Sequence, residues 1–252
     1  MALLDVREVD MVFGGVHAVQ NLSFSVQQGA IHSVIGPNGA GKTTLFNMIT
    51  GIYIPTRGAI ELDGDDVTGK PPFELAKRGM SRTFQNLQIC MNMTAIENVM
   101  VGSHLRLSQR LIPSLLRMRS ITRADNACRE ESAQLMEFVG VGKYVRSHAS
   151  QMPYGALKRL EIARALAAKP KILLLDEPAA GLNQTETREI DELIQKIAAA
   201  GVTVVLVEHD MKLVMNISDH ILVLDYGKKL AEGTAAEVRS NPDVIVAYLG
   251  GA

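Results

Sequence analysis

The stretch "GPNGAGKTT" (residues 36–44) decides the fold class of this chain. It satisfies the phosphate-binding pattern G-x-x-x-x-G-K-[ST]. The apolar segment "AIHSVI" precedes it and the apolar segment "LFNMIT" follows it, which predicts a strand before the loop and a helix after it. Glycines let backbone N–H groups converge on phosphate oxygens, and a helix start adds partial positive charge. The stretch therefore predicts a nucleoside triphosphate site in an α/β fold.

Two side chains of this loop are expected to take part in the chemistry. Lys42 has the length to reach the β- and γ-phosphates, and Thr43 can offer its hydroxyl to Mg²⁺. The predicted nucleotide-binding residues of the loop are Gly36, Pro37, Asn38, Gly39, Ala40, Gly41, Lys42, Thr43 and Thr44.

The segment "ILLLDEP" (172–178) is expected to contribute acidic side chains to the same site as the phosphate loop. Its continuous apolar run predicts a strand buried on both faces, and two carboxylates follow at its C-terminal end, where open α/β sheets bind ligands. We expect Asp176 to hold Mg²⁺ and Glu177 to polarise a water molecule for in-line attack on the γ-phosphate. An acidic loop without function is the alternative for this segment alone. The presence of the phosphate loop favours the catalytic interpretation.

Two further side chains extend the predicted catalytic set. The segment "VVLVEHD" (204–210) repeats the pattern and places His209 at a strand end, within expected reach of the γ-phosphate and the attacking water. Gln85, in "RTFQN", ends another short apolar stretch and is expected to join the Mg²⁺ and water shell. A lone histidine is more often a structural residue, and the glutamine by itself would indicate nothing.

Composition excludes several classes of protein. The 252 residues include 26 basic and 27 acidic side chains, so no overall field attracts nucleic acid or an anionic membrane. The two cysteines are far apart, which predicts free thiols in a reducing compartment. Acidic residues follow the first apolar ones, so no secretory signal is expected. The longest apolar run is too short for a bilayer, which needs about 20 residues. A cytoplasmic location is expected.

The two ends of the chain favour strands. Near the start, "LLDVREV", "AVQNLSFSV" and "AIHSVIGP" carry strand-type residues, and "GAIELDGDDV" predicts a hairpin that turns at Asp63 and Gly64. After Pro170 the pattern returns to α/β, and "HILVLDYGKKLAEG" predicts a second hairpin. We therefore expect the two ends to form one α/β domain.

The middle of the chain favours helices. Thr94 and Glu97 fit a capping box, and "TRADNACREESAQLMEFVGV" suits an exposed amphipathic helix. Later, Asn183 and Glu186 fit a second capping box. That helix has apolar residues at i, i+3, i+4 and i+7, namely Ile190, Leu193, Ile194 and Ile197. The helical middle is therefore predicted to be inserted into the α/β domain.

These motifs, in this order, resemble the ATP-binding subunit of ABC transporters over essentially the whole chain. Each motif of the family has a counterpart here. The A-loop aromatic matches Phe13, Walker A matches 36–44, the Q-loop matches Gln85 and the signature helix matches 152–158. Walker B matches 172–177, the D-loop matches 180–183 and the switch histidine matches His209. The resemblance implies a P-loop NTPase with a RecA-like parallel-sheet core, an antiparallel β subdomain and an inserted α-helical subdomain. It places the core at 1–87 and 166–252 and the helical subdomain at 88–165. It also implies hydrolysis of ATP, with Mg²⁺, in a head-to-tail dimer.

The segment "QMPYGALKRLEIARAL" (151–166) is the signature region of this resemblance. In the family its helix start faces the γ-phosphate of ATP held by the opposite subunit. Pro153 and Ala156 depart from the usual L-S-G-G-Q pattern, so Tyr154, Gly155 and the helix N–H groups remain to bind the nucleotide. Loss of one charge-assisted hydrogen bond costs on the order of 1.5–3 kcal/mol, which weakens closure without forbidding it.

Three other features are open to two interpretations. Phe13 can stack on adenine, because an aromatic face needs no hydrogen-bond readout, or it can be a core residue. Asn183 stands where the family usually has aspartate, which keeps hydrogen bonding and loses the charge. Met91, Met93 and Met100 suit a surface that adapts to a moving helix of a membrane partner, or a methionine-rich core.

A finer resemblance is to the LivG-type ATPase of branched-chain amino acid importers. It rests on "RGMSRTFQNLQI", "DEPAAGLN" and "NPDVIVAYLG", which are more particular than the shared ATPase motifs. It implies two membrane permeases, a second ATPase subunit (LivF-type, or a homodimer), a periplasmic binding protein, and a peripheral position on the cytoplasmic face of the inner membrane. Importers of urea or short amides share much of the pattern.

Two other classes of function stay open. An ATP-gated scaffold with little turnover fits the altered signature, although the intact Lys42, Glu177 and His209 argue against it. A soluble ABC ATPase of DNA repair or translation usually has paired cassettes or long coiled-coil insertions, and this chain has neither.

Overall fold

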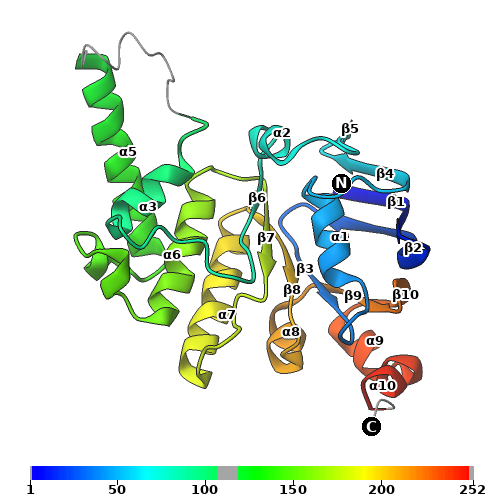
Figure 1. Ribbon diagram of the computed structural model, residues 1–252. Helices are drawn as coiled ribbons and strands as arrows, with labels where there is room; N and C mark the ends of the chain where they lie inside the picture. The colour runs from blue at the N-terminus through cyan, green and yellow to red at the C-terminus, as the bar shows by residue number, and fades with distance from the viewer. Residues whose placement is uncertain (1, 107–118, 250–252) are drawn as a thin grey trace. The chain divides into compact units, whose positions relative to one another are not determined.

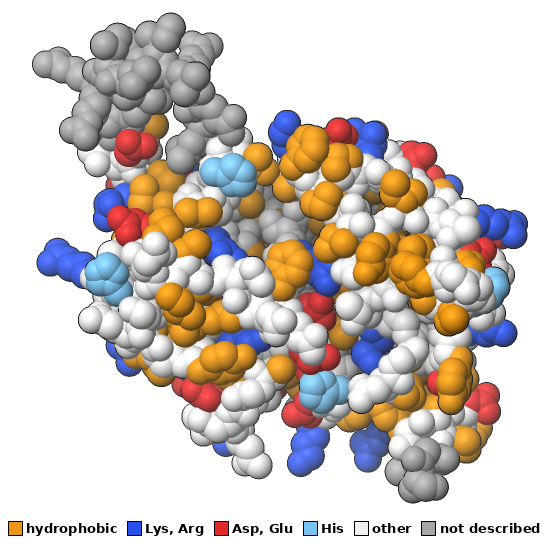
Figure 2. Space-filling model, in the orientation of Figure 1, with side chains coloured by type: hydrophobic (Ala, Val, Ile, Leu, Met, Phe, Trp, Pro, Cys, Tyr) orange, Lys and Arg blue, Asp and Glu red, His pale blue; other side chains and the backbone are white. Residues whose placement is uncertain are grey.

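The computed structural model describes residues 2–106 and 119–249. The chain divides into two compact units, one formed by Met1–Arg82 with Lys171–Ala252 and the other by Thr83–Pro170. The subdomain boundaries expected at 88 and 165 stay predictions. On the face drawn in Figure 2, acidic and basic side chains are interspersed, in line with the formal net charge of −1.

Among the described residues, a six-stranded sheet forms the centre of the first unit, in the order β10-β9-β3-β8-β7-β6 (Figure 1). Its strands are β3 (Ile31–Ile35), β6 (Met80–Arg82), β7 (Ile172–Asp176), β8 (Thr203–Val207), β9 (His220–Asp225) and β10 (Lys228–Gly233). All neighbours are parallel except β9 and β10, which form the predicted hairpin.

The three middle strands explain the position of the site. Every residue of β3, β7 and β8 is buried. The apolar sequences of β7 and β8 predict this for parallel strands covered on both faces, whereas β3 also buries His32 and Ser33. Val34 lies opposite Val207, and Val207 lies opposite Asp176. The loops that follow these strands therefore leave the sheet at one edge, where open parallel sheets bind ligands.

A second, antiparallel sheet of the first unit joins four described strands in the order β2-β1-β4-β5. They are β1 (Ala2–Phe13), β2 (Val16–Gln27), β4 (Arg57–Leu62) and β5 (Asp65–Asp66). The hairpin predicted at Asp63 and Gly64 is confirmed, since both residues have positive φ, 54° and 82°, as a two-residue hairpin turn requires.

The first strand is longer than the sequence predicts. We expected a strand over "LLDVREV", and β1 continues to Phe13 through irregular pairing with β2. Glu8 and Asn21 have positive φ at these irregularities. The N–H of Glu8 donates to Ser23 Oγ and that of Asn21 donates to Asp10 Oδ1, both at 2.8 Å, so side chains satisfy the groups that the bulged backbone leaves unpaired.

Helices cover both faces of the central sheet. They are α1 (Lys42–Ile49), α2 (Pro72–Lys77), α7 (Gln184–Ala199), α8 (Met211–Ile217), α9 (Ala235–Ser240) and α10 (Pro242–Leu249). Alternate residues of the strands point to opposite faces. Val34 joins a core with α1 and the antiparallel sheet, whereas Ile35 joins a core with α8, α9 and α10. The predicted capping box of Asn183 and Glu186 begins α7, and its four predicted apolar residues are buried.

The second unit is helical in its described part. It contains α3 (Ala95–Gly102), α5 (Arg119–Phe138) and α6 (Tyr154–Leu166), with short 3₁₀ turns at Gly142–Tyr144 and Ala149–Gln151. The predicted capping box begins α3, where Thr94 and Glu97 bond each other's backbone N–H groups. The predicted exposed amphipathic helix corresponds to α5. No described helix is long and apolar enough to cross a membrane, and both cysteines are free thiols.

A buried histidine makes folding stability depend on pH. His32 in β3 is 1% exposed, its ring lies 5.9 Å from that of His220, and its Nε2 has no hydrogen-bond partner among the described residues. Burial, and then the charge of His220, lowers the pKa of His32 from 6.5 to about 4. As the pH falls, His32 is protonated near pH 6.5 in the unfolded chain but only near pH 4 in the folded chain. The free energy of unfolding therefore falls as the pH drops through this range.

We expect the free energy of unfolding to fall by about 3 kcal/mol over this pH range, at roughly 1.4 kcal/mol per pH unit. Urea unfolding of the wild type and of His32→Leu at pH 7 and pH 4.5 measures it, and the variant should lose most of the dependence. Asp191 acts with the opposite sign, because burial raises its pKa from 3.8 to about 6. A parallel Asp191→Asn series separates the two. An unchanged slope in His32→Leu would contradict the assignment.

Candidate functional site

The phosphate loop joins β3 to α1 through a run of glycines in the left-handed region. Gly39 and Gly41 have φ of 81° and 98°, and Gly41 is the N-cap of α1. A Cβ on Gly41 would lie 2.5 Å from the carbonyl oxygen of Ala18. The loop therefore needs glycine here for both backbone angle and space, and it ends at a helix start, which is where phosphates bind.

This geometry predicts unequal effects of alanine at the two glycines. Gly39→Ala incurs only the cost of the left-handed backbone, because nothing lies within 4 Å of its Cβ, whereas Gly41→Ala also forces the Ala18 carbonyl to move. We expect Gly41→Ala to weaken ATP binding by roughly tenfold more than Gly39→Ala. The clash with the Ala18 carbonyl adds to the backbone strain that both variants share, which costs on the order of 1–3 kcal/mol. Equilibrium titration with a fluorescent ATP analogue checks this, and equal affinities would contradict it.

Lys42 begins α1 with its ammonium beside the loop. Its Nζ donates to the carbonyl oxygens of Gly36, at 2.7 Å, and Pro37, at 3.0 Å. Burial lowers the pKa of Lys42, and the charges of Glu177 and Asp176 oppose that change. The predicted phosphate-binding lysine therefore lies in the field of the two predicted catalytic-loop carboxylates.

Asp176 ends β7 and is held by an arginine that the sequence analysis missed. Arg82 Nη2 lies 2.7 Å from Asp176 Oδ2, and both side chains are more than nine-tenths buried. Arg82 Nη1 also donates to Asn47 Oδ1 and Thr50 Oγ1, at 2.7 and 2.9 Å. Because Asn47 is in α1 and Thr50 caps it, Arg82 ties the end of β7 to the helix that begins at the phosphate loop.

The described residues of the first unit suit Mg²⁺. Thr43 and Asp176 supply the hydroxyl and carboxylate oxygens that this ion prefers. Within the described residues, no group of three or more His, Cys, Asp or Glu side chains is placed to hold a metal. Mg²⁺ is commonly bound through one or two protein oxygens together with substrate phosphates, and the Thr43 hydroxyl and the Asp176 carboxylate are oxygens of this kind.

Glu177 and His209 come together at the edge of the sheet. Glu177 has a φ of 49°, an uncommon angle for a side chain other than glycine, and its N–H donates to the carbonyl oxygen of Val207 at 2.9 Å. Its Oε1 lies 3.8 Å from His209 Nδ1, and the imidazole is 64% exposed. The structure thus places a carboxylate and an exposed imidazole side by side. The roles predicted for Glu177 and His209 toward the attacking water stay predictions.

An aromatic pair lies at the end of β1. Phe13 is 42% exposed, so it is not the fully buried core residue of the alternative interpretation. Its ring meets that of Tyr53 edge to face, with centroids 5.3 Å apart. No sequence motif includes Tyr53, whose only signal was its position as an aromatic residue shortly after α1. An exposed ring braced by a second ring suits stacking on a base.

In the second unit, α6 begins at Tyr154, after Pro153 as N-cap. The N-cap has no side chain that bonds the first amides of the helix. Tyr154 is 46% exposed and Gly155 is buried. The N–H groups of Ala156 and Leu157 donate to the Pro153 carbonyl, both at 3.0 Å. The amides at this helix start that could bind a ligand beside the exposed ring are therefore those of Tyr154 and Gly155.

The segment that contains Gln85 packs against the same helix. Lys158 Nζ donates to the Gln85 carbonyl at 3.4 Å, and Glu161 Oε1 accepts from the Gln88 N–H at 3.2 Å. The predicted role of Gln85 in the Mg²⁺ shell stays a prediction. Of the three methionines in the following segment, Met91 is 43% exposed and Met93 and Met100 are partly buried, so none is a true core residue.

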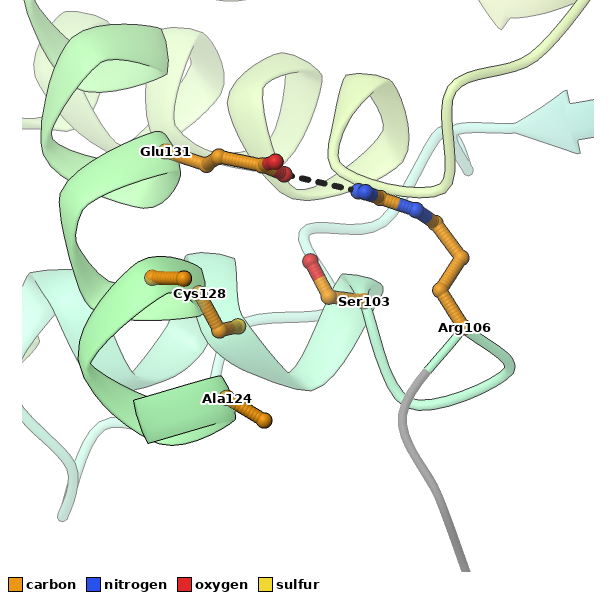
Figure 3. A pocket seen from close by; sticks show the side chains of 6 residues that line it. Ser103, Arg106, Ala124, Cys128 and Glu131 are labelled. Atoms are coloured by element: carbon orange, nitrogen blue, oxygen red, sulfur yellow. Dashed lines mark hydrogen bonds and ion pairs between the residues drawn. The ribbon is translucent and has the colours of Figure 1, made fainter. Parts of the chain in front are cut away.

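A separate hollow of about 190 Å³ lies between α3 and α5 (Figure 3). Its lining residues are Ser103, Arg106, Ala124, Ala127, Cys128 and Glu131. The ion pair between Arg106 and Glu131, 3.0 Å long, closes one side of it. None of the predicted site residues lines this hollow.

Comparison with known proteins identifies the family. Residues 19–180 match the family model described as ABC transporter, and residues 228–252 match the model described as branched-chain amino acid ATP-binding cassette transporter. The chain is 46% identical to the high-affinity branched-chain amino acid transport ATP-binding protein BraF of Pseudomonas aeruginosa and 47% identical to its LivG counterpart of Escherichia coli K12. Each alignment covers 98% of both chains.

Solved structures agree with this assignment. The fold matches the ADP conformation of MJ1267, an ATP-binding cassette of an ABC transporter, with a TM-score of 0.87, 32% identity and 99% of each chain covered. It also matches a nucleotide-free ATP-binding cassette from an ABC transporter, with a TM-score of 0.85, 32% identity and coverage of 98% of this chain and 99% of the other. The predicted ABC cassette fold, a P-loop NTPase with antiparallel β and helical parts, is confirmed, and the chain belongs to the ABC transporter family of ATP-binding proteins.

Proposed function

We propose that this chain hydrolyses ATP to power an importer of branched-chain amino acids. Membership of the ABC family makes it an ATPase subunit of a transport complex. The cargo is inferred from the relatives, whose names state branched-chain amino acid transport, and from the match of residues 228–252. The observation that supports hydrolysis best is the Glu177–His209 pair, 3.8 Å apart, in the loops beside the phosphate loop.

Nucleotide binding is proposed to use both ends of the ATP molecule. Phe13 stacks on adenine, and residues 36–44 hold the phosphates through backbone N–H groups and the ammonium of Lys42. Thr43, Asp176 and Gln85 would hold Mg²⁺, which would supply positive charge to the phosphates when bound. Arg82 keeps the carboxylate of Asp176 in place for this purpose through its 2.7 Å ion pair.

Hydrolysis is proposed to begin with a water molecule near Glu177. The carboxylate accepts a hydrogen bond from this water and orients it for in-line attack on the γ-phosphorus. The exposed imidazole of His209 lies beside the same carboxylate and can donate a hydrogen bond to the γ-phosphate or the water. Both groups therefore act on the attacking water and the γ-phosphate.

The second half of the site is proposed to come from another subunit. Tyr154 and the amide of Gly155 contact the γ-phosphate of ATP bound to the partner, which is a second copy or a LivF-type ATPase. Backbone donors at a helix start bind an anion without the serine that Pro153 replaces. The assembly also includes two membrane permeases and, indirectly, a periplasmic binding protein. The subunit then lies on the cytoplasmic face of the inner membrane.

One experiment separates this proposal from its alternatives. The chain is expressed with its neighbouring genes, the complex is purified in detergent and reconstituted in liposomes, and ATP hydrolysis is measured with uptake of labelled leucine or labelled urea. Leucine uptake that needs ATP supports the proposal. Uptake of urea alone would overturn the cargo, an assembled complex without turnover would indicate an ATP-gated scaffold, and a chain that co-purifies with no membrane protein would indicate a soluble ATPase.

A further inference from the structure

The loop between β8 and α8 contains a buried carboxylate to which none of the roles above applies. Glu208 directly precedes His209, and it is 1% exposed. A carboxylate is rarely buried unless several donors satisfy it, because removing its charge from water is costly. The atoms that satisfy it therefore indicate what it does.

Glu208 bonds the backbones of both loops that contain the predicted catalytic residues. Its Oε1 accepts from the N–H of Ala179 at 2.9 Å, and its Oε2 accepts from the N–H of His209 at 3.1 Å. Ala179 lies two residues after Glu177. One carboxylate thus joins the segment that follows Glu177 to the backbone of His209 itself.

These bonds lie where the sheet no longer holds the two loops together. The pairing of β7 with β8 ends at Asp176 and Val207, and the last backbone bond runs from the Glu177 N–H to the Val207 carbonyl. Beyond this point, the Glu208 carboxylate takes the place of a further step of the ladder. It is therefore placed to set the separation of Glu177 and His209.

The surroundings of Glu208 disfavour its charged form, which lowers the stability of the folded chain. Burial raises the pKa of Glu208, and the N–H groups of Ala179 and His209 oppose that change. Asp191 in α7 and Asp210 add negative charge nearby, and the pKa of Asp191 is raised by burial first and by the charges of Asp210 and Glu208 next. Burying a carboxylate near other acids lowers the free energy of unfolding. Glu208 is therefore better explained by a role in the site than by a role in stability.

We infer that Glu208 is a positioning residue for ATP hydrolysis: by accepting from the Ala179 and His209 amides it holds the two loops together, so that Glu177 Oε1 stays 3.8 Å from His209 Nδ1. This inference rests on the proposed function. Glu208 does not touch the nucleotide or the attacking water in this role. Removing it should therefore lower kcat and leave ATP binding at the phosphate loop unchanged.

The test compares Glu208→Gln and Glu208→Ala with the wild type in the assembled complex. In Glu208→Ala both amides lose their acceptor, and we expect kcat to fall by roughly 10²-fold, the effect of a misplacement of about 1 Å, with KM for ATP nearly constant. Glu208→Gln keeps the shape and one acceptor oxygen, so its loss should be smaller. The matched control is Glu237→Gln, because Glu237 also accepts from a backbone N–H, that of Thr234, but caps α9.

A second readout separates positioning from general destabilisation. Amide hydrogen exchange at Ala179 and His209 should accelerate in both Glu208 variants and not in Glu237→Gln. If Glu208→Ala fails to fold, the isosteric Gln variant still decides the question. Wild-type kcat in Glu208→Gln with accelerated exchange, or a loss of kcat with exchange unchanged, would overturn the inference. If the wild-type complex itself showed no ATP turnover, the proposed function would fail instead.

Discussion

Glu177→Gln is expected to abolish ATP turnover and to leave ATP binding intact. The amide keeps the size of the side chain but cannot accept a proton from water, and general-base catalysis contributes about 10²–10⁴-fold to such reactions. Because ATP still binds and is not cleaved, the variant should accumulate as a closed dimer. Steady-state hydrolysis by the assembled complex, ATP titration and light scattering with ATP present measure the three effects.

The control for this prediction is a change of the same chemistry away from the site. Glu237→Gln, at the cap of α9, should hydrolyse ATP at the wild-type rate. A wild-type rate in Glu177→Gln would show that this carboxylate is not the base. Loss of ATP binding in Glu177→Gln would instead indicate that the charge of Glu177 is needed to keep Lys42 in place, since the two interact electrostatically.

Asp176→Leu is expected to have the largest effect on stability. It leaves the guanidinium of Arg82, whose side chain is 7% exposed, without its carboxylate. Removing one partner of a buried ion pair costs about 3–5 kcal/mol, because the remaining charge stays buried without compensation. Urea unfolding followed by circular dichroism measures this cost, as a fall in the midpoint relative to the wild type.

The double variant Arg82→Met with Asp176→Leu tests the cause of that loss. Replacing both charges with apolar side chains removes the uncompensated charge, so most of the stability should return. Activity should not return, because the proposed Mg²⁺ ligand is absent. A double variant as unstable as the single one would show that packing, and not the ion pair, explains the loss.

Local signals in the sequence predicted much of the fold. The capping boxes that begin at Thr94 and Asn183 and the turn at Asp63 and Gly64 lie within four residues of sequence, and each is present. The fully buried strands β7 and β8 were visible as apolar runs for the same reason. Such features depend on propensity and patterning, which a single segment contains in full.

The parts that were missed depend on contacts between distant segments. No sequence pattern assigns a role to Arg82. Its role appears only because β6 pairs with β7, which brings Arg82 to Asp176, 94 residues later in the sequence. Glu208 gave no signal beside the more prominent His209, since its partner Ala179 lies on another strand's loop. The bulges of β1 likewise depend on Ser23 and Asp10 across the strand pair.

The exposed ring of Phe13, which contacts the ring of Tyr53, has a consequence for which nucleotide is hydrolysed. Stacking on a flat π-system attracts guanine about as well as adenine, because hydrogen-bonding edges are not read. On the proposed binding mode, the enzyme accepts GTP with little discrimination. The abundance of each purine triphosphate in the cell, more than recognition by this subunit, then determines which one drives uptake.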